Sequence, residues 1–507
     1  MASGVLVALV GCGFSRSAWA VDLADPGIHA WGTYDFDVPR PGGGTFRSRL
    51  YYPATVPGVS TPFDPSGGPY PVISFGHGWL QTNDRYSSTF EHLASHGYFL
   101  IAPNTQTGLI PDQVQFRTDM IQSLDYMVAQ GTTPSSPYFG SVDVTSRGLS
   151  GHSMGGAASI AIAAGDPTIR AVANMAAANI LANPSVIEMM ASVTSPINLL
   201  SGSDDLIAPP DVHQVPMYNN GGAPKMLTSL EGGCHAYFQD SGPAITDGST
   251  MSRADQLEHT RRELVTYFNF YLKEDESLWR EVWGPEAFTD PLVDVTAASG
   301  IGVSSNVGSQ SVFPGETGTF DLTITNSGRS AAYYDLFAED QAWDTSFSMA
   351  ATALLNPGES AIVSVYVTPP SDAFALQDQV LISARSSADG LTRGWTMLAT
   401  TTPEFNEGDV DGDGDADFQD FLALQVGYGI TSGAARTDGD LDDDGDVDFQ
   451  DFLYLQANFG GDALARLADG GLKTAAVPEP SATLLAAIGL VIVSIRRIRK
   501  LTARSHN

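Results

Sequence analysis

The segment "SRGLSGHSMGGAASIAIAAG", residues 146–165, constrains the fold more than any other part of this chain. An apolar stretch leads into glycines around Ser153, and a second, alanine-rich stretch leads away from them. Between a strand and a helix, Gly-x-Ser-x-Gly is typical of a sharp turn that exposes a serine hydroxyl at a sheet edge. A glycine-rich turn without chemistry would give the same short pattern, so the serine's role depends on the rest of the chain.

Residues 21–290 alternate between strand-like and helix-like segments. The run "YPVISFGHGW" ends in glycines, "STFEHLASHGYFLIAP" reads as a helix and then a buried strand, and "RTDMIQSLDYMVAQ" has helical spacing. "SPINLLSGSDDLIAP" and "PKMLTSLEGGCH" are two further predicted strands, and "ADQLEHTRRELVTYFNFYLK" is the predicted closing helix. This alternation predicts an α/β domain with a doubly wound, mainly parallel sheet.

A serine hydroxyl becomes a useful nucleophile only when a base takes its proton. On such a sheet the partners follow the serine in the order acid, then histidine, each at the carboxyl end of a strand. Asp204 and Asp205 both follow a predicted strand, and either could simply cap a turn. His213 lies too close to them in sequence to reach the next strand end, and His259 lies within a predicted helix. His235, which follows the next strand, is therefore the predicted base.

Acyl transfer also needs hydrogen-bond donors for the oxyanion. The backbone N–H of Met154, directly after the serine, is one candidate. The loop after "VISFGHGW" offers a second, the N–H of Trp79. His152 is not the predicted base, because a side chain adjacent to the serine on this turn points away from its hydroxyl.

From about Tyr70 to Trp283 the sequence resembles α/β-hydrolases that include cutinase-like polyesterases, chlorophyllases and dienelactone-hydrolase relatives. The segments that carry the resemblance are "YPVISFGHGW", "LASHGYFLIAPNTQTG", "GHSMGG", "SGSDDLIAPPDVHQVPMY" and "EGGCHAYF". It implies a serine carboxylic-ester hydrolase that works through an acyl-enzyme, without a catalytic cofactor. The aspartate two residues before Ile-Ala-Pro is the acid in polyesterases, which selects Asp205. The resemblance also assigns the oxyanion donors to Trp79 and Met154.

Two features depart from the polyesterase pattern. Polyesterases active on aromatic polyesters carry a tryptophan shortly after the strand that follows the nucleophile helix, where this chain reads "AVANMAAANILANP". The C-terminal disulfide usual in that group cannot form either, because Cys12 and Cys234 are the two cysteines of the chain. Ester hydrolysis remains the expectation, whereas hydrolysis of aromatic polyesters or chlorophyll is not implied.

Residues 291–403 show a different sequence pattern. "GETGTFDLTITNSG", "ESAIVSVYVTPP" and "DQVLISARSS" alternate apolar and polar residues between turn residues, which predicts a small antiparallel β-sandwich. The segment contains no catalytic cluster, so a spacer or adhesion role is expected.

A 31-residue repeat follows within residues 404–462, which hold 17 acidic residues and one basic residue. Each copy reads D-x-D-x-D-G-x-x-D-x-x-D, the ligand spacing of a Ca²⁺ loop, and is followed by an apolar helix. Carboxylates are expected as ligands at positions 1, 3, 5, 9 and 12, and the backbone carbonyl at position 7. The predicted Ca²⁺ ligands are Asp409, Asp411, Asp413, Asp415, Asp417 and Asp420 in the first loop, and Asp440, Asp442, Asp444, Asp446, Asp448 and Asp451 in the second.

The paired loops resemble a type I dockerin, which also has aspartate at position 12. This resemblance implies a small helical module that requires Ca²⁺ to fold and docks onto a cohesin-like protein.

The two ends of the chain read as targeting segments. Residues 1–20 end in "AWA" after a short apolar core and are predicted to be a signal peptide; a lipoprotein box ending at Cys12 is the rival reading. Residues 463–476 form a predicted linker. Residues 477–507 resemble a PEP-CTERM sorting signal, which implies an exosortase-type enzyme and delivery to the cell surface, with a transmembrane anchor as the alternative. The protein is therefore expected to be exported.

The net charge of −33 argues against nucleic acid as a partner, since polyphosphates would be repelled. The sequence thus predicts an exported serine esterase that acts on a small or polymeric ester. The alternative is a non-catalytic surface adhesion or scaffold protein with a decayed hydrolase domain.

Overall fold

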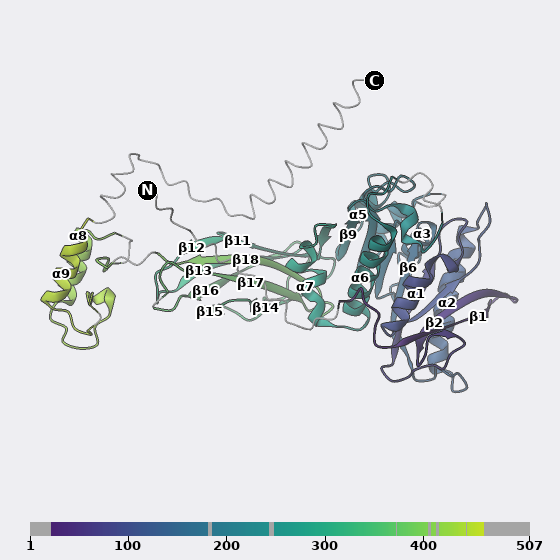
Figure 1. Ribbon diagram of the computed structural model, residues 1–507, viewed down its shortest axis with the longest axis horizontal. Coiled ribbons are helices and arrows are strands. Elements are labelled where there is room, and N and C mark those ends of the chain that lie inside the picture. Colours follow the sequence, from purple (N-terminus) through teal and green to yellow (C-terminus); the bar gives the residue numbers. More distant parts are fainter. Residues whose placement is uncertain are drawn as a thin grey trace, which may run out of the picture. The chain divides into compact units, whose positions relative to one another are not determined.

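The computed structural model describes residues 22–180, 185–242, 248–371, 373–403, 407–411, 415–442 and 444–460 (Figure 1). The chain divides into two compact units, one that ends at Gly300 but adds Asp389–Arg393, and one that contains the rest. The predicted signal peptide, the ligand Asp413, the linker and the C-terminal sorting segment lie outside the described residues. No helix in the described part of the chain is long and apolar enough to cross a membrane.

The first unit is built on a ten-stranded sheet with the order β10-β9-β8-β7-β6-β4-β5-β2-β1-β3. Six neighbouring strands of this sheet pair in parallel, namely β9, β8, β7, β6, β4 and β5. This pairing confirms the predicted mainly parallel sheet. The strands are β1 (Ala30–Pro39), β2 (Thr45–Ala54), β3 (Gly58–Val59), β4 (Tyr70–Gly76), β5 (Phe99–Pro103), β6 (Val142–His152), β7 (Ala171–Met175), β8 (Ile197–Gly202), β9 (Lys225–Leu230) and β10 (Val293–Ala298).

Antiparallel strands extend this sheet at both sides. β1 and β2 pair with each other and join the parallel strands through β5. β10 pairs with β9, although its residues fall in the stretch where the β-sandwich was expected to begin. The sheet thus extends past residue 290, because β10 completes the hydrogen bonding of β9.

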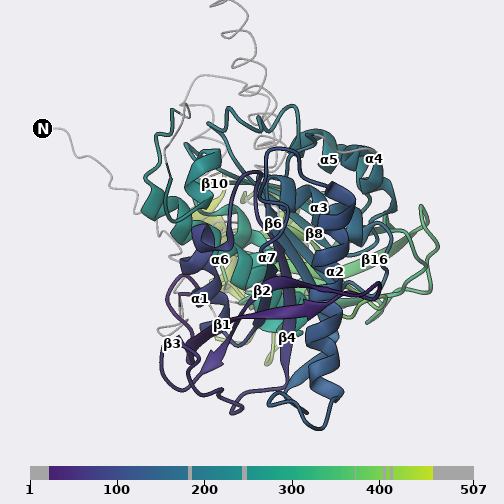
Figure 2. The same ribbon diagram turned by 90° about the vertical axis from the view of Figure 1, so that its right-hand side faces the viewer.

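Helices cover both faces of the sheet. Figure 2 shows α2 and α3 on one face and α1 and α6 on the other, with β1 and β2 at the near edge. The central strands are buried on both sides, which explains their nearly continuous apolar sequence. The helices are α1 (Ser87–Ser95), α2 (Gln113–Thr132), α3 (Met154–Ala163), α4 (Val186–Met189), α5 (Gln214–Asn220), α6 (Arg253–Leu272) and α7 (Trp279–Val282).

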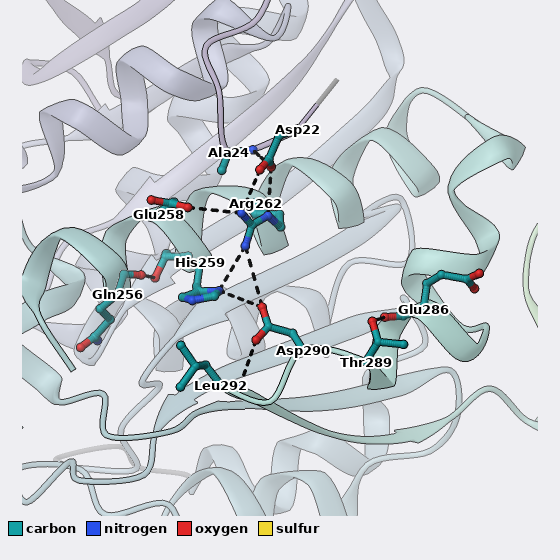
Figure 3. A network of polar contacts seen from close by, with 11 residues as sticks. Asp22, Ala24, Gln256, Glu258, His259, Arg262, Glu286, Thr289, Asp290 and Leu292 are labelled. Atoms are coloured by element: carbon teal, nitrogen blue, oxygen red, sulfur yellow. Dashed lines mark hydrogen bonds and ion pairs between the residues drawn. The ribbon is translucent and has the colours of Figure 1, made fainter. Parts of the chain in front are cut away.

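A polar network on α6 ties distant parts of this unit together (Figure 3). The Arg262 guanidinium donates to both carboxylate oxygens of Asp22, at 3.0 and 3.1 Å, and to His259 Nδ1 at 3.2 Å. The Asp290 carboxylate lies 3.5 Å from the same His259 nitrogen and accepts from the Leu292 amide just before β10. Arg262 also lies 4.0 Å from the Asp290 carboxylate, so it anchors both the first described residue and the segment that enters β10 to one helix.

The second unit contains two four-stranded sheets, ordered β11-β13-β16-β15 and β12-β18-β17-β14. In β13 and β16 alternate side chains are buried, and residues from both sheets form one apolar core. This is the packing expected of the predicted sandwich. The strands are β11 (Ile301–Ser305), β12 (Ser309–Ser311), β13 (Gly318–Asn326), β14 (Tyr334–Glu339), β15 (Asp344–Phe347), β16 (Ser360–Thr368), β17 (Gln377–Ser386) and β18 (Arg393–Thr401).

The acidic repeat contains two equivalent helices, α8 (Phe418–Gly427) and α9 (Phe449–Asn458). Each starts at the end of an aspartate-rich loop, with a capping box at its first turn. Their small shared core consists of residues that repeat with the same 31-residue period, namely Val410 and Leu441, Ala416 and Val447, and Leu424 and Leu455.

Candidate active site

Ser153 lies in a strained turn between β6 and α3. Its backbone has φ 55° and ψ −113°, a conformation that is costly for a residue with a side chain. Hydrogen bonds hold it there: the Ser153 amide donates to Met175 O at the end of β7, and the amides of Ala157 and Ala178 donate to Ser153 O. Because the surrounding backbone fixes this conformation, the serine is displayed at the carboxyl edge of the sheet.

The glycines of the segment are required by close packing. A Cβ on Gly155 would lie 1.9 Å from Gly76 O at the end of β4, and a Cβ on Gly151 would lie 2.4 Å from the carbonyl carbon of Gly155. Neither position has room for a methyl group, because the blocking atoms belong to the backbone. These glycines let α3 start directly against β4 and β6.

We expect Gly155→Ala to destabilise the first unit by about 3 kcal/mol or more, because the backbone must move to admit the methyl group. Gly165→Ala is the matched control, since the nearest atom to its added Cβ is 3.8 Å away. Thermal unfolding monitored by circular dichroism compares the two variants. A Gly155→Ala variant as stable as Gly165→Ala would contradict this account of the turn.

The structure brings Asp205 and His235 together. Asp205 follows β8 and His235 begins the short 3₁₀ helix that follows β9, so both lie at the edge that carries Ser153. His235 Nδ1 lies 2.7 Å from Asp205 Oδ2. The other oxygen, Oδ1, accepts from the amides of Ile207 and Ala208 at 2.8 and 2.7 Å. Asp205 is 2 % exposed, so its carboxylate is held in one orientation.

Asp204, the alternative acid, faces elsewhere. Its carboxylate accepts from the amide and hydroxyl of Thr250 in an exposed position. The geometry therefore distinguishes the two adjacent aspartates, which sequence reasoning separated only through the resemblance.

Ser153 is 8 % exposed, and no hydrogen bond from its hydroxyl is found among the described residues. The imidazole of His152, the residue before it, lies with its ring centre 4.5 Å from that of His235. His235 is thus next to the nucleophile turn, while the contact between the serine hydroxyl and His235 stays a prediction.

Two further histidines flank His235. Burial, together with nearby His235, lowers the pKa of His152 far below its usual value, so this imidazole is neutral. Burial also lowers the pKa of His213, against the opposing effect of Asp205. His213 Nδ1 accepts from the Asn179 amide at 3.1 Å, which leaves its proton on Nε2. Sequence reasoning considered His213 only as a base, and spacing gave no sign of its contact with the segment after β7.

The predicted oxyanion donors lie at the same edge. Met154 is the first residue of α3 and is buried, while Trp79 follows β4 and is 46 % exposed. The Trp79 indole donates to Leu109 O at 3.2 Å, so the loops after β4 and β5 are joined.

Exposed apolar side chains occur on the loops after β4, β5 and β8, all at the carboxyl edge of the sheet. Ile110, for example, is 95 % exposed. Single exposed apolar residues are common, but several on loops at one edge of a sheet indicate a contact surface. We call this set the apolar rim; its members are Trp79, Leu80, Leu109, Ile110, Leu206 and Ile207.

The acidic repeat forms carboxylate clusters in both loops. The carboxylate oxygens within each cluster lie within 4.8 Å of one another. The clusters are Asp409–Asp411–Asp420 and Asp415–Asp417–Asp420 in the first loop, and Asp440–Asp442–Asp451 and Asp446–Asp448–Asp451 in the second. These clusters could bind a metal ion. Asp415 and Asp446 contribute carboxylates to them, whereas sequence reasoning expected their backbone carbonyls.

Asp420 and Asp451 organise the loops. Asp420 accepts from the amides of Val410, Asp411 and Asp417, and Asp451 accepts from the equivalent three amides of the second loop. In the second loop, Asp440 Oδ1 and Asp446 Oδ1 are buried without a hydrogen-bond partner among the described residues. Buried carboxylate oxygens of this kind fit a hard cation such as Ca²⁺, which prefers oxygen ligands.

Comparison with known proteins identifies the class of the first unit. Residues 39–254 match the family model described as PET hydrolase-like. The first unit therefore contains a PETase/cutinase-like α/β-hydrolase domain. The match covers less than half of the chain and excludes the sandwich and the acidic repeat.

Individual relatives point to the same class. The chain is 29 % identical over 197 residues to cutinase est2 of Thermobifida alba, an alignment covering 38 % of this chain and 57 % of that protein. It is 27 % identical over 197 residues to a cutinase of Thermobifida fusca, with the same coverage. Chlorophyllase-1 of Arabidopsis thaliana is 35 % identical over 107 residues, which are 20 % of this chain and 33 % of that protein. The chain thus spans little more than half the length of these two cutinases.

Proposed function

We propose that this protein is an exported serine carboxylic-ester hydrolase with Ser153, Asp205 and His235 as its catalytic triad. The observation that carries the proposal is the 2.7 Å contact between His235 Nδ1 and Asp205 Oδ2, at the same sheet edge as the strained Ser153. This contact places the Nδ1 proton toward Asp205, so Nε2 is the nitrogen of His235 that we assign to proton transfer. The similarity to cutinases supports an ester as the substrate.

In the proposed reaction, Ser153 Oγ attacks the ester carbonyl carbon as His235 Nε2 takes the hydroxyl proton. The carbonyl oxygen becomes an oxyanion, which the amides of Met154 and Trp79 stabilise. Collapse of this intermediate breaks the bond to the alcohol oxygen, and His235 returns its proton to the departing alcohol. Water, deprotonated by His235, then attacks the acyl-enzyme, releasing the carboxylic acid and the Ser153 hydroxyl. Asp205 orients His235 and stabilises its charged form.

We propose a water-insoluble aliphatic ester as the substrate class. The apolar rim offers contact area to an apolar chain or surface at the sheet edge that carries Ser153. The segment after β7 carries no aromatic residue to stack on an aromatic acid: Asn179 contacts His213 there. The rim favours a water-insoluble ester, and the segment after β7 favours an aliphatic over an aromatic one.

We expect the double variant Ile110→Ser/Leu206→Ser to hydrolyse an aliphatic polyester film about tenfold more slowly than the wild type. Its rate on p-nitrophenyl acetate should stay unchanged, because a small soluble ester does not need the rim. Val59→Ser, an exposed apolar position on β3, is the matched control. Equal film hydrolysis by the rim variant and the control would contradict the proposed substrate class.

For the rest of the chain we propose the roles that the sequence patterns imply. The acidic repeat is a dockerin-like module that binds Ca²⁺ and docks onto a cohesin-like protein. The C-terminal segment is a PEP-CTERM-type signal handled by an exosortase-type enzyme, so that the esterase acts at the cell surface or outside the cell. The carboxylate clusters of the repeat support the Ca²⁺ binding.

A further inference from the structure

We propose that Tyr86 is a positioning residue for ester hydrolysis, its hydroxyl joining the loop that carries one oxyanion donor to the turn that carries the nucleophile. This inference rests on the proposed function. It adds a residue that the triad and the two oxyanion donors do not include.

The Tyr86 hydroxyl links two segments that are far apart in sequence. It accepts a hydrogen bond from the amide of Gly78 at 3.0 Å, and it lies 2.9 Å from Nδ1 of His152. Gly78 directly precedes Trp79, the proposed oxyanion donor, and His152 directly precedes Ser153. One hydroxyl therefore connects the residue before the proposed oxyanion donor with the residue before the nucleophile. Donor and nucleophile must both lie next to the ester carbonyl.

The direction of each hydrogen bond follows from the protonation states. The Gly78 amide can only donate, so the phenol oxygen accepts from it. The buried His152 stays neutral, and burial raises the pKa of Tyr86, so the phenol keeps its proton and donates a hydrogen bond to Nδ1. Gln239 Nε2 also lies 3.5 Å from Nδ1, which makes it a weaker donor to the same atom.

The side chains and backbone around the Tyr86 hydroxyl are tightly packed. Tyr86 is fully buried, and its ring contacts those of Phe75 and Phe90, with centroids 4.9 and 5.9 Å away. A Cβ on Gly78 would lie 3.0 Å from His152 Nδ1, so the loop and the turn are nearly in contact. The phenol therefore sets the spacing between them, and without its oxygen the Gly78 amide would lose a buried acceptor.

A positioning role predicts a particular kinetic signature. Oxyanion stabilisation matters in the transition state and hardly at all in the ground state. We expect Tyr86→Phe, which keeps the ring, to lower kcat on p-nitrophenyl butyrate about tenfold while KM stays within twofold. Affinity for an alkylboronic acid, which forms a tetrahedral adduct with the serine, should fall by a similar factor.

Tyr98→Phe is the matched control. Tyr98 is also fully buried, and its hydroxyl donates a 2.7 Å hydrogen bond to Asn269 of α6. It contacts neither the nucleophile turn nor the Trp79 loop in the described structure. The two variants lose the same atom in the same unit, so we expect Tyr98→Phe to keep the wild-type kcat at a comparable melting temperature.

A second variant tests the path through His152. His152→Leu removes the acceptor of the phenol, and we expect its kcat to fall by a factor similar to that of Tyr86→Phe. The double variant Tyr86→Phe/His152→Leu should lose little more than either single variant, because both break one connection. Independent, multiplicative losses would overturn the link between the two residues.

The outcomes separate this inference from the proposed function. If Ser153→Ala is inactive but Tyr86→Phe keeps the wild-type kcat and boronic acid affinity, the positioning role is wrong and the esterase proposal stands. If Ser153→Ala keeps its activity, the proposed function fails first. A lower melting temperature of Tyr86→Phe with unchanged kcat, measured where it is folded, would show a purely structural role and overturn the inference.

Discussion

Ser153→Ala is expected to lower hydrolysis of a p-nitrophenyl ester by a factor of about 10³ to 10⁶, without loss of folding. The large factor follows from the proposed mechanism, because without the hydroxyl no acyl-enzyme can form. What remains is the weaker assistance that oxyanion donors give to direct attack by water. Steady-state rates measured at equal concentrations of folded protein give the factor.

Ser159→Ala is the matched control for this prediction. Ser159 is a buried serine of α3, and its hydroxyl bonds to Gly156 O and Asn174. It should keep its activity, and a fluorophosphonate probe should label the wild type on the peptide that contains Ser153. An unlabelled wild type, or a Ser153→Ala variant with more than a few per cent of the wild-type rate, would favour the rival view of a non-catalytic surface protein.

Removal of Ca²⁺ by a chelator is expected to unfold the acidic repeat while esterase activity stays intact. The clusters bring like charges within 4.8 Å, and without a cation this repulsion opposes the folded loops. Loss of hydration and the neighbouring carboxylates already raise the pKa of Asp442 and Asp446 above the usual value. The small core between α8 and α9 is formed by few residues, so it has little stability to offset the repulsion.

Limited proteolysis of the full-length protein tests this prediction. With Ca²⁺ the segment from 407 to 460 should resist cleavage, and with chelator it should be cut while the ester hydrolysis rate stays the same. Asp440→Asn should require more Ca²⁺ for protection, whereas Asp438→Asn, outside both loops, should not. Equal protection with and without Ca²⁺ would contradict a Ca²⁺-dependent fold.

Much of the proposed active site could be predicted from the sequence because its signals are local. The strand, turn and helix around Ser153 follow from glycine spacing, and residues at the ends of successive parallel strands must meet at one edge. That reasoning placed Asp205 and His235 at the edge where the structure brings them together. It did not predict the antiparallel strands β1, β2 and β10, because the pairing of a strand at the side of a sheet depends on which strand lies next to it in the tertiary structure.

The sequence by itself determined the class of the first unit, the order of its candidate catalytic residues and the two-loop repeat. Only the tertiary structure decided which of two adjacent aspartates faces His235, and only there does Tyr86 meet both Gly78 and His152. The physical reason is that backbone periodicity and turn chemistry act between near neighbours. The direction of a buried side chain, in contrast, depends on hydrogen bonds to segments far away in sequence.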